Sequence, residues 1–471
     1  MPKRARAALS MAVGVLLAAG CSGGSHSATP PSGSATTASA SIPPTASAPT
    51  SPAPAGYPNW PTYHGDAART GVSSAMPAVG ANQTVIASVA LDAAVYASPI
   101  VVNRVIVVAT ENDSLYGVSA KGRIVWRRNL GKPVPLRDLP CGNINPSGIT
   151  GTPVYDATTK LVYVVAELAA PVRHELVALS PGTGRVRWTR SLGLGGTSQD
   201  AMQQRGALTI ASGRVWAPFG GRNGDCGRYR GKLVGIPATG KGATITYTVP
   251  TTREGGIWAA PGPSVSADGH LYVSVGNGAS GLGGNYDHTD SVLELDGSAR
   301  LVGSFSPSTW ARDNSADLDL GSQGPALVGP WIFSVGKSGT AYVLRQGALG
   351  GIGGQVSSGE LCTSYGGTAV DAGVVYVPCS DGLRAVRIDD AGRMQPLWHA
   401  ALSIAGSPVV GGGRVWSLDQ DAGVLYALDP ATGAARSHVS VGVTSRFATP
   451  ALYGRDVLVP TIHGLTIVAT S

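Results

Sequence analysis

A pattern of short β-prone segments recurs along this chain and limits the folds that it can adopt. Each unit starts at a small residue or glycine, often followed by proline, and continues with an alternating apolar stretch. The starting points are Ser98-Pro99, Thr152-Pro153, Ala207-Leu208, Gly262-Pro263, Gly324-Pro325, Thr368-Ala369, Ser407-Pro408 and Thr449-Pro450. Two further β-rich runs follow each start, and a fourth often ends in tryptophan, as at Trp126, Trp188 and Trp398. Units of four short strands predict the blades of a β-propeller.

The sequence therefore predicts an all-β, eight-bladed β-propeller of four-stranded antiparallel blades. The last unit stops after its third strand, at Ser471, and would leave an exposed sheet edge. Residues 83–91 precede the first unit and alternate apolar with other side chains, as in Val85, Ala87 and Val89. We expect this N-terminal strand to complete the last blade and close the ring.

Strand direction sorts the connections of such blades onto two faces. Loops between second and third strands, and loops that lead from a fourth strand to the next blade, share one face. The long segments are all expected on this side, which we call the long-loop face: 131–148, 193–204, 219–231, 250–260, 276–290, 306–321 and 345–364. Long loops on a rigid scaffold commonly carry binding sites. We therefore expect an unidentified ligand or envelope protein to bind here.

Four cysteines belong to the long-loop face: Cys141, Cys226, Cys362 and Cys379. An even number in an exported protein favours disulfides, and four cysteines allow three connectivities. Their shared face favours Cys141–Cys226 between neighbouring loops and Cys362–Cys379 within one blade. No CxxC or CxxCH motif occurs, so the sequence supports neither a zinc ribbon nor a covalently attached c-type haem, and these cysteines are not assigned as metal ligands.

The N-terminal segment has the features of an export and anchoring sequence. Residues 1–20 combine a positive start, an apolar run too short to span a bilayer and small residues before Cys21. Leu17 to Cys21 resembles a bacterial lipobox, which implies a lipidated Cys21; the alternative is an ordinary signal peptide. Residues 21–56 are rich in Ser, Thr, Ala and Pro and predict a tether. We expect an extracytoplasmic protein that contacts the bacterial membrane through its lipid anchor alone.

Charge composition bears on the partners of the chain. Charged residues make up 13% of the chain, and three of the cations behind its formal charge of +7 lie in the signal peptide. No dense basic run occurs, so we expect no nucleic-acid partner. We expect the mature propeller, residues 57–471, to be a monomer.

The turn from Ala178 to Trp188, with a second copy from Ala427 to Gly433, resembles the tryptophan motif of the pyrroloquinoline quinone (PQQ)-type β-propeller repeat. That family includes quinoprotein alcohol dehydrogenases and the non-enzymatic outer-membrane assembly lipoprotein BamB. The resemblance covers roughly residues 57–471. It implies the same eight-bladed ring as the repeat pattern.

A sharper resemblance to quinoprotein dehydrogenases, particularly the polyvinyl-alcohol dehydrogenase type, covers residues 255–344. Its motifs are Gly256-Ile257-Trp258, Val275-Gly276-Asn277-Gly278, Asp290 to Asp296, Asp317 to Gly321 and Gly336-Lys337-Ser338-Gly339. By this resemblance Asn277 would ligate a calcium ion and Lys337 would contact the quinone. An amide oxygen suits calcium, and a cation beside a quinone oxygen stabilises negative charge. Trp258 and Trp310 are candidates for a stacking floor under a planar ligand; the alternative is that they cap the core between loops.

Two departures count against catalysis. The family's general-base Asp follows a Trp directly, whereas Trp310 is followed by Ala311, and the adjacent cysteine pair of the family is absent. Asp313, Asp317 or Asp319 could substitute for the base. The alternative role of these three Asp side chains is to brace the loops through hydrogen bonds. We therefore assign no catalytic residue. We therefore expect a ligand-binding or protein-binding scaffold; the alternatives are a PQQ- and calcium-dependent alcohol dehydrogenase and a purely structural envelope protein.

Overall fold

The computed structural model of this chain describes residues 56–471, and these form one unit. The signal peptide of residues 1–20, the lipidation site at Cys21 and nearly all of the 21–56 tether lie outside the described residues. In the described part of the chain, no helix is long and apolar enough to cross a membrane.

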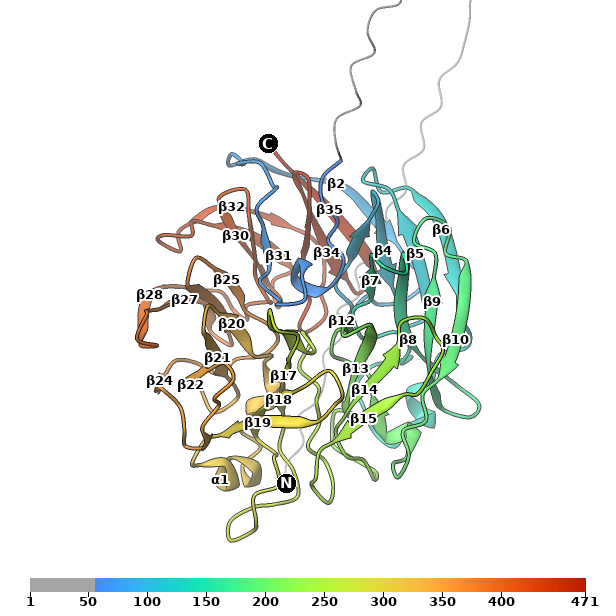
Figure 1. The fold of residues 1–471 in the computed structure, drawn as a ribbon. Coiled ribbons are helices and arrows are strands. Elements are labelled where there is room, and N and C mark those ends of the chain that lie inside the picture. The colour runs from blue at the N-terminus through green and yellow to red at the C-terminus, as the bar shows by residue number, and fades with distance from the viewer. Residues whose placement is uncertain (1–55) are drawn as a thin grey trace, which may run out of the picture. The chain divides into compact units, whose positions relative to one another are not determined.

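Eight sheets are arranged in a ring (Figure 1), which confirms the eight-bladed propeller of four-stranded antiparallel blades. Blade 1 comprises β3 (Ile100–Val102), β4 (Val105–Ala109), β5 (Ser114–Val118) and β6 (Ile124–Asn129), and blade 2 comprises β7 (Val154–Asp156), β8 (Leu161–Leu168), β9 (Arg173–Leu179) and β10 (Val186–Ser191). Blade 3 comprises β12 (Thr209–Ala211), β13 (Arg214–Gly221), β14 (Lys232–Pro237) and β15 (Ile245–Thr248), and blade 4 comprises β16 (Ser264–Val265), β17 (Leu271–Val275), β18 (Ser291–Leu295) and β19 (Leu301–Ser306).

Blade 5 comprises β20 (Ala326–Val328), β21 (Trp331–Val335), β22 (Thr340–Arg345) and β24 (Ser357–Glu360), and blade 6 comprises β25 (Ala369–Asp371), β26 (Val374–Cys379), β27 (Gly382–Ile388) and β28 (Met394–Ala400). Blade 7 comprises β29 (Val409–Gly411), β30 (Arg414–Asp419), β31 (Val424–Leu428) and β32 (Ala435–Ser440), and blade 8 comprises β33 (Ala451–Tyr453), β34 (Asp456–Thr461), β35 (Gly464–Thr470) and β2 (Gln83–Ala90). The remaining elements are β1 (Val72–Ser73), β11 (Met202–Gln203), β23 (Gly351–Ile352), α1 (Trp310–Ser315), and the 3₁₀ helices η1 (Tyr63–Gly65), η2 (Leu136–Asp138), η3 (Gln199–Ala201) and η4 (Leu320–Ser322).

The core lies between neighbouring sheets. The short first strands, such as β3, are fully buried near the axis, whereas fourth strands such as β6 are largely exposed at the rim. Val107 of blade 1 and Val164 of blade 2 belong to one buried apolar cluster. Because each blade buries side chains against both neighbours, the ring is stabilised mainly by this apolar burial.

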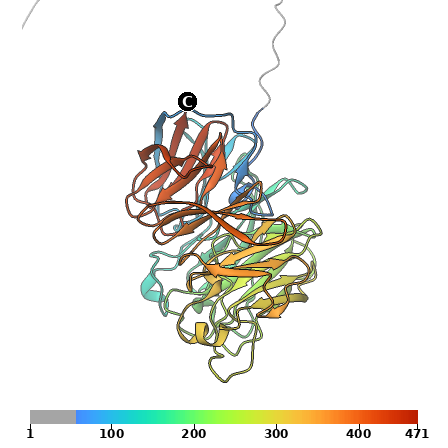
Figure 2. The same ribbon diagram turned by 90° about the vertical axis from the view of Figure 1, so that its left-hand side faces the viewer.

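Strand β2 pairs antiparallel with β35, from Gln83 opposite Thr470 to Ala90 opposite Gly464. Figures 1 and 2 both show the blue β2 beside the red C-terminal strands. The last blade therefore contains strands from both ends of the described chain. Its core residue Leu458 shares one apolar cluster with Ile106 of blade 1.

One loop assignment from the sequence is wrong in part. Residues 345–364 were expected as a single connection on the long-loop face, but β24 lies within them and is the fourth strand of blade 5. The connection from β22 to β24 therefore joins third and fourth strands and belongs to the opposite face. The sequence missed this strand because Ser357–Glu360 has no apolar alternation.

Tryptophans of fourth strands fasten neighbouring blades together. The indole N–H of Trp126 in blade 1 donates to the Pro181 carbonyl in the turn of blade 2, at 2.9 Å. Trp398 in blade 6 donates in the same way to Pro430 in blade 7, at 3.0 Å. A side chain at Gly184, whose φ is +63°, would clash with the Trp126 ring at 2.4 Å. The tryptophan motif seen in the sequence is thus a blade-to-blade contact.

The segment before β2 crosses the axis and contacts inner strands around the ring; we call residues 60–73 the axial plug. Its backbone hydrogen bonds join Trp60 to Val101 in blade 1, Pro61 to Tyr155 in blade 2, Ala67 to Val265 in blade 4, Thr70 to Val370 in blade 6 and Gly71 to Val410 in blade 7. The buried Arg69 donates to the Leu208 carbonyl beside blade 3 at 3.0 Å. The axial plug therefore occupies the centre of the ring between the inner strands.

Candidate functional site

Three residues that the sequence analysis named lie close together on the long-loop face: Trp258, Asp319 and Lys337. The indole N–H of Trp258 donates to Asp319 Oδ1 at 3.1 Å. Lys337 Nζ lies 2.6 Å from Asp319 Oδ2 and 5.8 Å from the centre of the Trp258 ring. The structure thus brings Trp258 and Lys337 together through a buried carboxylate, and we call this group the Trp–Asp–Lys cluster.

Glycines allow the three loops of the cluster to approach one another. A side chain at Gly276 would lie 2.9 Å from both Asp319 Oδ1 and the indole nitrogen of Trp258. A side chain at Gly321 would meet the backbone of Gly276 at 2.3 Å. The close spacing of the cluster therefore depends on backbone contacts that larger residues would prevent.

Lys337 remains a cation in this setting. Its side chain is 18% exposed and pairs with Asp319, which is 1% exposed, and with Asp317, which is 69% exposed. Burial alone would lower the pKa of Lys337, but the two carboxylates outweigh it and hold the pKa above its ordinary value. Lys337 is thus charged and already paired with two carboxylates of its own chain.

Asn277 lies next to the cluster, at the end of β17. Its backbone carbonyl accepts a hydrogen bond from Gly255 at 2.8 Å. Its half-buried side-chain amide makes no hydrogen bond with any residue of the described range 56–471. The amide is therefore free to bind a ligand, although in the described residues no group of three His, Cys, Asp or Glu side chains has the arrangement of a metal site.

Trp310 lies in a different environment. It begins α1, is 8% exposed, and packs its ring against Tyr286 at 5.4 Å between centroids. Asn314 of the same helix binds the Asn277 loop, because its Oδ1 accepts from Gly278 N at 3.2 Å and its Nδ2 donates to Ser280 O at 2.8 Å. Trp310 thus helps to anchor the loop that carries Asn277, and no contact joins it to Trp258 within residues 56–471.

Next to the cluster, a small cavity opens on the propeller axis; we call it the axial chamber. Its wall comprises Tyr63, Tyr96, Thr150, Thr152, Arg205, Ala260, Arg446 and Phe447. Apart from Tyr63, which comes from the axial plug, these residues lie a few positions before the first strands of blades 1, 2, 3, 4 and 8. Sequence reasoning missed them, yet they occupy equivalent places just before the starting points of the repeat. That register would have identified them.

Phe447 connects the axial chamber to the Trp–Asp–Lys cluster. Its ring contacts Trp258 at 6.3 Å and Tyr365 at 5.9 Å, and the Arg205 guanidinium lies over it at 4.6 Å. Its backbone φ is 68°, a left-handed conformation that a bulky residue rarely adopts. Such strain costs about 1–3 kcal/mol and is commonly found at binding sites.

The loops around the site are cross-linked. Disulfide bonds join Cys141 to Cys226 and Cys362 to Cys379. Beside the first disulfide, Arg222 forms a buried ion pair with Glu167 of β8. The Cys141–Cys226 bond holds the 131–148 and 219–231 loops together, and the Arg222–Glu167 pair ties the second of these loops to β8.

The residues around Trp258 do not fit PQQ with calcium in this conformation. The cavity volume of the axial chamber is about 10 Å³, which is room for about one water molecule. Phe447 lies against Trp258, and Lys337 is paired with Asp317 and Asp319 rather than presented to a ligand. A tricyclic quinone would require Phe447 to move.

Comparisons with known proteins agree with this architecture. The family described as outer membrane protein assembly factor BamB matches residues 78–280. A search of curated proteins gave no match. Among solved structures, the quinohemoprotein alcohol dehydrogenase of Comamonas testosteroni matches with a TM-score of 0.67 and 15% identity, over 88% of this chain and 80% of that chain. The quinohemoprotein alcohol dehydrogenase ADHIIG of Pseudomonas putida HK5 matches with a TM-score of 0.67 and 14% identity, over the same shares.

BamB from Moraxella catarrhalis matches with a TM-score of 0.57 and 16% identity, over 83% of this chain and 98% of that chain. At these identities the structural matches establish the fold and leave the activity open. The BamB match and the two disulfides indicate an extracytoplasmic protein. The family match over residues 78–280, the tryptophan turns and the shared fold are all similar to those of PQQ-type β-propeller repeat proteins.

Proposed function

We propose that this chain is a lipid-anchored, extracytoplasmic propeller that binds a ligand or an envelope protein through its long-loop face. The observation that carries the proposal is the pairing of the Trp–Asp–Lys cluster, in which Lys337 and the Trp258 N–H are both bound to Asp319. Groups held by one another in this way build a rigid surface. The free amide of Asn277 and the axial chamber supply polar groups within the same surface.

A second candidate function is a quinoprotein alcohol dehydrogenase. It is supported by the close approach of Trp258 and Lys337, two residues that the family resemblance selects, to the buried carboxylate of Asp319. Asn277, the third such residue, follows Gly276, which lies beside Trp258 and Asp319. Burial raises the pKa of Asp319, although Lys337 opposes this shift. This candidate requires Phe447 to leave the ring of Trp258.

One experiment separates the two. PQQ and calcium are added to the full chain, and the quinone absorbance and the reduction of a dye by alcohols are measured. The binding-module proposal expects no dye reduction in the wild type. Dye reduction that is lost in Lys337→Ala and retained in Lys121→Ala, an exposed lysine, would overturn it in favour of the dehydrogenase.

The binding role itself is tested on protein purified from its own host. Mass spectrometry under native conditions should detect a retained small molecule or a co-purifying envelope protein in the wild type. Trp258→Ala should lose it, because the cluster holds the long-loop face in shape. Retention that is unchanged in the variant would place the binding site elsewhere and refute the assignment to this face.

A further inference from the structure

We propose that the axial chamber binds the carboxylate group of a small organic acid through Arg205. This inference rests on the proposed function, because it names the class of ligand that the long-loop face would take. The carrying observation is a guanidinium on the chamber wall that has no anionic partner. Its surroundings are aromatic rings and hydroxyl groups, which suit an organic anion better than water alone.

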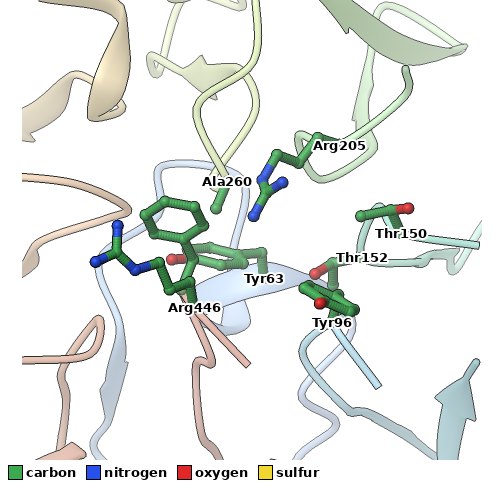
Figure 3. Close-up of a pocket in the computed structure, with 8 residues that line it drawn as sticks. Tyr63, Tyr96, Thr150, Thr152, Arg205, Ala260 and Arg446 are labelled. Carbon is green, nitrogen blue, oxygen red and sulfur yellow. The ribbon is translucent and has the colours of Figure 1, made fainter. Parts of the chain in front are cut away.

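Arg205 lies just before β12 and points into the axial chamber above Tyr63 (Figure 3). Its guanidinium lies over the ring of Phe447 at 4.6 Å and over that of Tyr96 at 6.0 Å. Among residues 56–471 it makes no hydrogen bond and no ion pair. A half-buried charge of this kind is normally paired, which makes Arg205 a candidate to bind an anion.

The nearest carboxyl does not fill this role. Glu111 forms no ion pair with Arg205 in the described residues: its Oε2 accepts from Gly148 N at 2.7 Å and from the Thr150 hydroxyl at 3.2 Å, and its Oε1 is buried without a hydrogen-bond partner. Burial raises the pKa of Glu111 to about 7, so that much of it is neutral in neutral solution. Arg205 is therefore left to recognise an anion that comes from outside the chain.

The other wall groups complete a carboxylate site. The Thr152 hydroxyl accepts from Ser98 N at 2.9 Å, so its own hydrogen is free to donate into the chamber. The planar fork of a guanidinium matches the two oxygens of a carboxylate. Of the two arginines that line the chamber, Arg446 points away from Arg205 (Figure 3), so one guanidinium with a neutral hydroxyl donor faces the ligand and favours a monoanion over a phosphate dianion. The rings of Phe447 and Tyr96 favour an apolar body on the same ligand.

Access comes from the long-loop face. The axial plug places Tyr63 at the floor of the chamber, where its hydroxyl meets that of Thr449 at 3.1 Å. On the opposite side Phe447 narrows the chamber to the volume of about one water molecule. A carboxylate can therefore enter only when the Phe447 side chain moves. The backbone of Phe447 is left-handed, and the same loop also contains Gly442, whose φ is positive. Arg446 is exposed at the rim and points away from Arg205 (Figure 3).

The test uses benzoate as the probe and benzamide as its neutral counterpart of the same shape. Calorimetric titration of the full chain at constant ionic strength should show benzoate binding at least about tenfold more tightly than benzamide. Arg205→Gln should abolish this difference, and Arg205→Lys should keep part of it. Arg253→Gln is the matched control, since Arg253 is an exposed arginine of the same face paired with Glu254, and it should leave benzoate binding unchanged.

Three results of the titrations would overturn the proposal. They are equal affinity of the wild type for benzoate and benzamide, benzoate binding that survives in Arg205→Gln, and phosphate binding more tightly than benzoate. The first comparison uses the wild type alone, so it stands even if Arg205→Gln fails to fold. A ligand retained from the host that benzoate cannot displace would refute this inference and leave the proposed function intact.

Discussion

Lys337 Nζ lies 2.6 Å from Oδ2 of the buried Asp319, whose other oxygen accepts the indole hydrogen of Trp258. A buried ion pair with both partners hydrogen-bonded fixes the geometry of a site more than it adds to the stability of the fold. Removal of one partner leaves the other as an uncompensated charge. The cluster is therefore where the long-loop face is most sensitive to single substitutions.

Asp319→Asn should destabilise the propeller by about 3 kcal/mol, because it leaves the Lys337 ammonium half-buried beside a neutral amide. Asp317→Asn is the matched control, since Asp317 pairs with the same lysine but is 69% exposed; its loss should cost at most about 1 kcal/mol. Urea denaturation of the two variants measures both values. Equal losses would contradict the central role of Asp319.

Trp126→Ala should lower the free energy of unfolding by about 2 kcal/mol, because it removes a half-buried ring and its bond to Pro181 between blades 1 and 2. Trp126→Phe keeps most of the ring and loses the hydrogen bond alone, so about 1 kcal/mol is expected. Thermal or urea unfolding distinguishes these values. A Phe variant as unstable as the Ala variant would show that the hydrogen bond, and not the ring, joins the blades.

Much of the fold could be predicted from the sequence because a propeller blade is a local unit. Alternation of apolar residues and the small residue at the first strand recur from blade to blade, and the turn with a tryptophan recurs in several of them. Strand β24 was missed because its residues, Ser357–Glu360, carry no apolar pattern and their pairing is set by the neighbouring strand β22. The sequence reveals a blade, but not every strand within it.

The candidate site was only partly predictable, for a different physical reason. Trp258 and Lys337 were selected by resemblance, and Asp319 was named only as one of three possible bases; that Asp319 joins the other two is seen only from its position in space. The axial plug lies outside the repeat, so nothing in the pattern indicated that Tyr63 reaches the axis. Contacts between distant segments at the axis depend on the closed ring, which a local pattern does not describe.

Replacement of Cys141 and Cys226 by serine should lower the free energy of unfolding by about 2–4 kcal/mol, because the bond closes a loop of 85 residues in the unfolded chain. The Cys362–Cys379 bond closes 17 residues, so its removal should cost less. Urea denaturation measures both double variants. Peptide mapping without reduction should recover these two linked pairs, and any other linkage would contradict the loop arrangement on the long-loop face.

The stability of the propeller should fall as pH rises, because of Asp113. This carboxyl is buried between blades 1 and 2, where burial first, and then the neighbouring Glu111 and Glu167, raise its pKa to about 9. Arg222 is paired with Glu167, and His174 lies 3.9 Å from the same carboxylate, so neither neutralises Asp113 directly. In the folded chain Asp113 thus keeps its proton up to about pH 9, whereas in the unfolded chain it ionises near pH 4.

Between these two pKa values the unfolded chain binds fewer protons than the folded chain, so each pH unit removes up to about 1.4 kcal/mol of stability. Glu111 adds to this fall up to about pH 7, since burial raises its pKa to that value. Asp113→Asn should make the fall shallower, because the amide cannot ionise and asparagine tolerates the local φ of 51°. Urea denaturation at pH 5, 7 and 8.5 measures the slope, with the exposed Asp138→Asn as the control. Parallel pH curves for the wild type and Asp113→Asn would show that Asp113 is ionised in the folded chain.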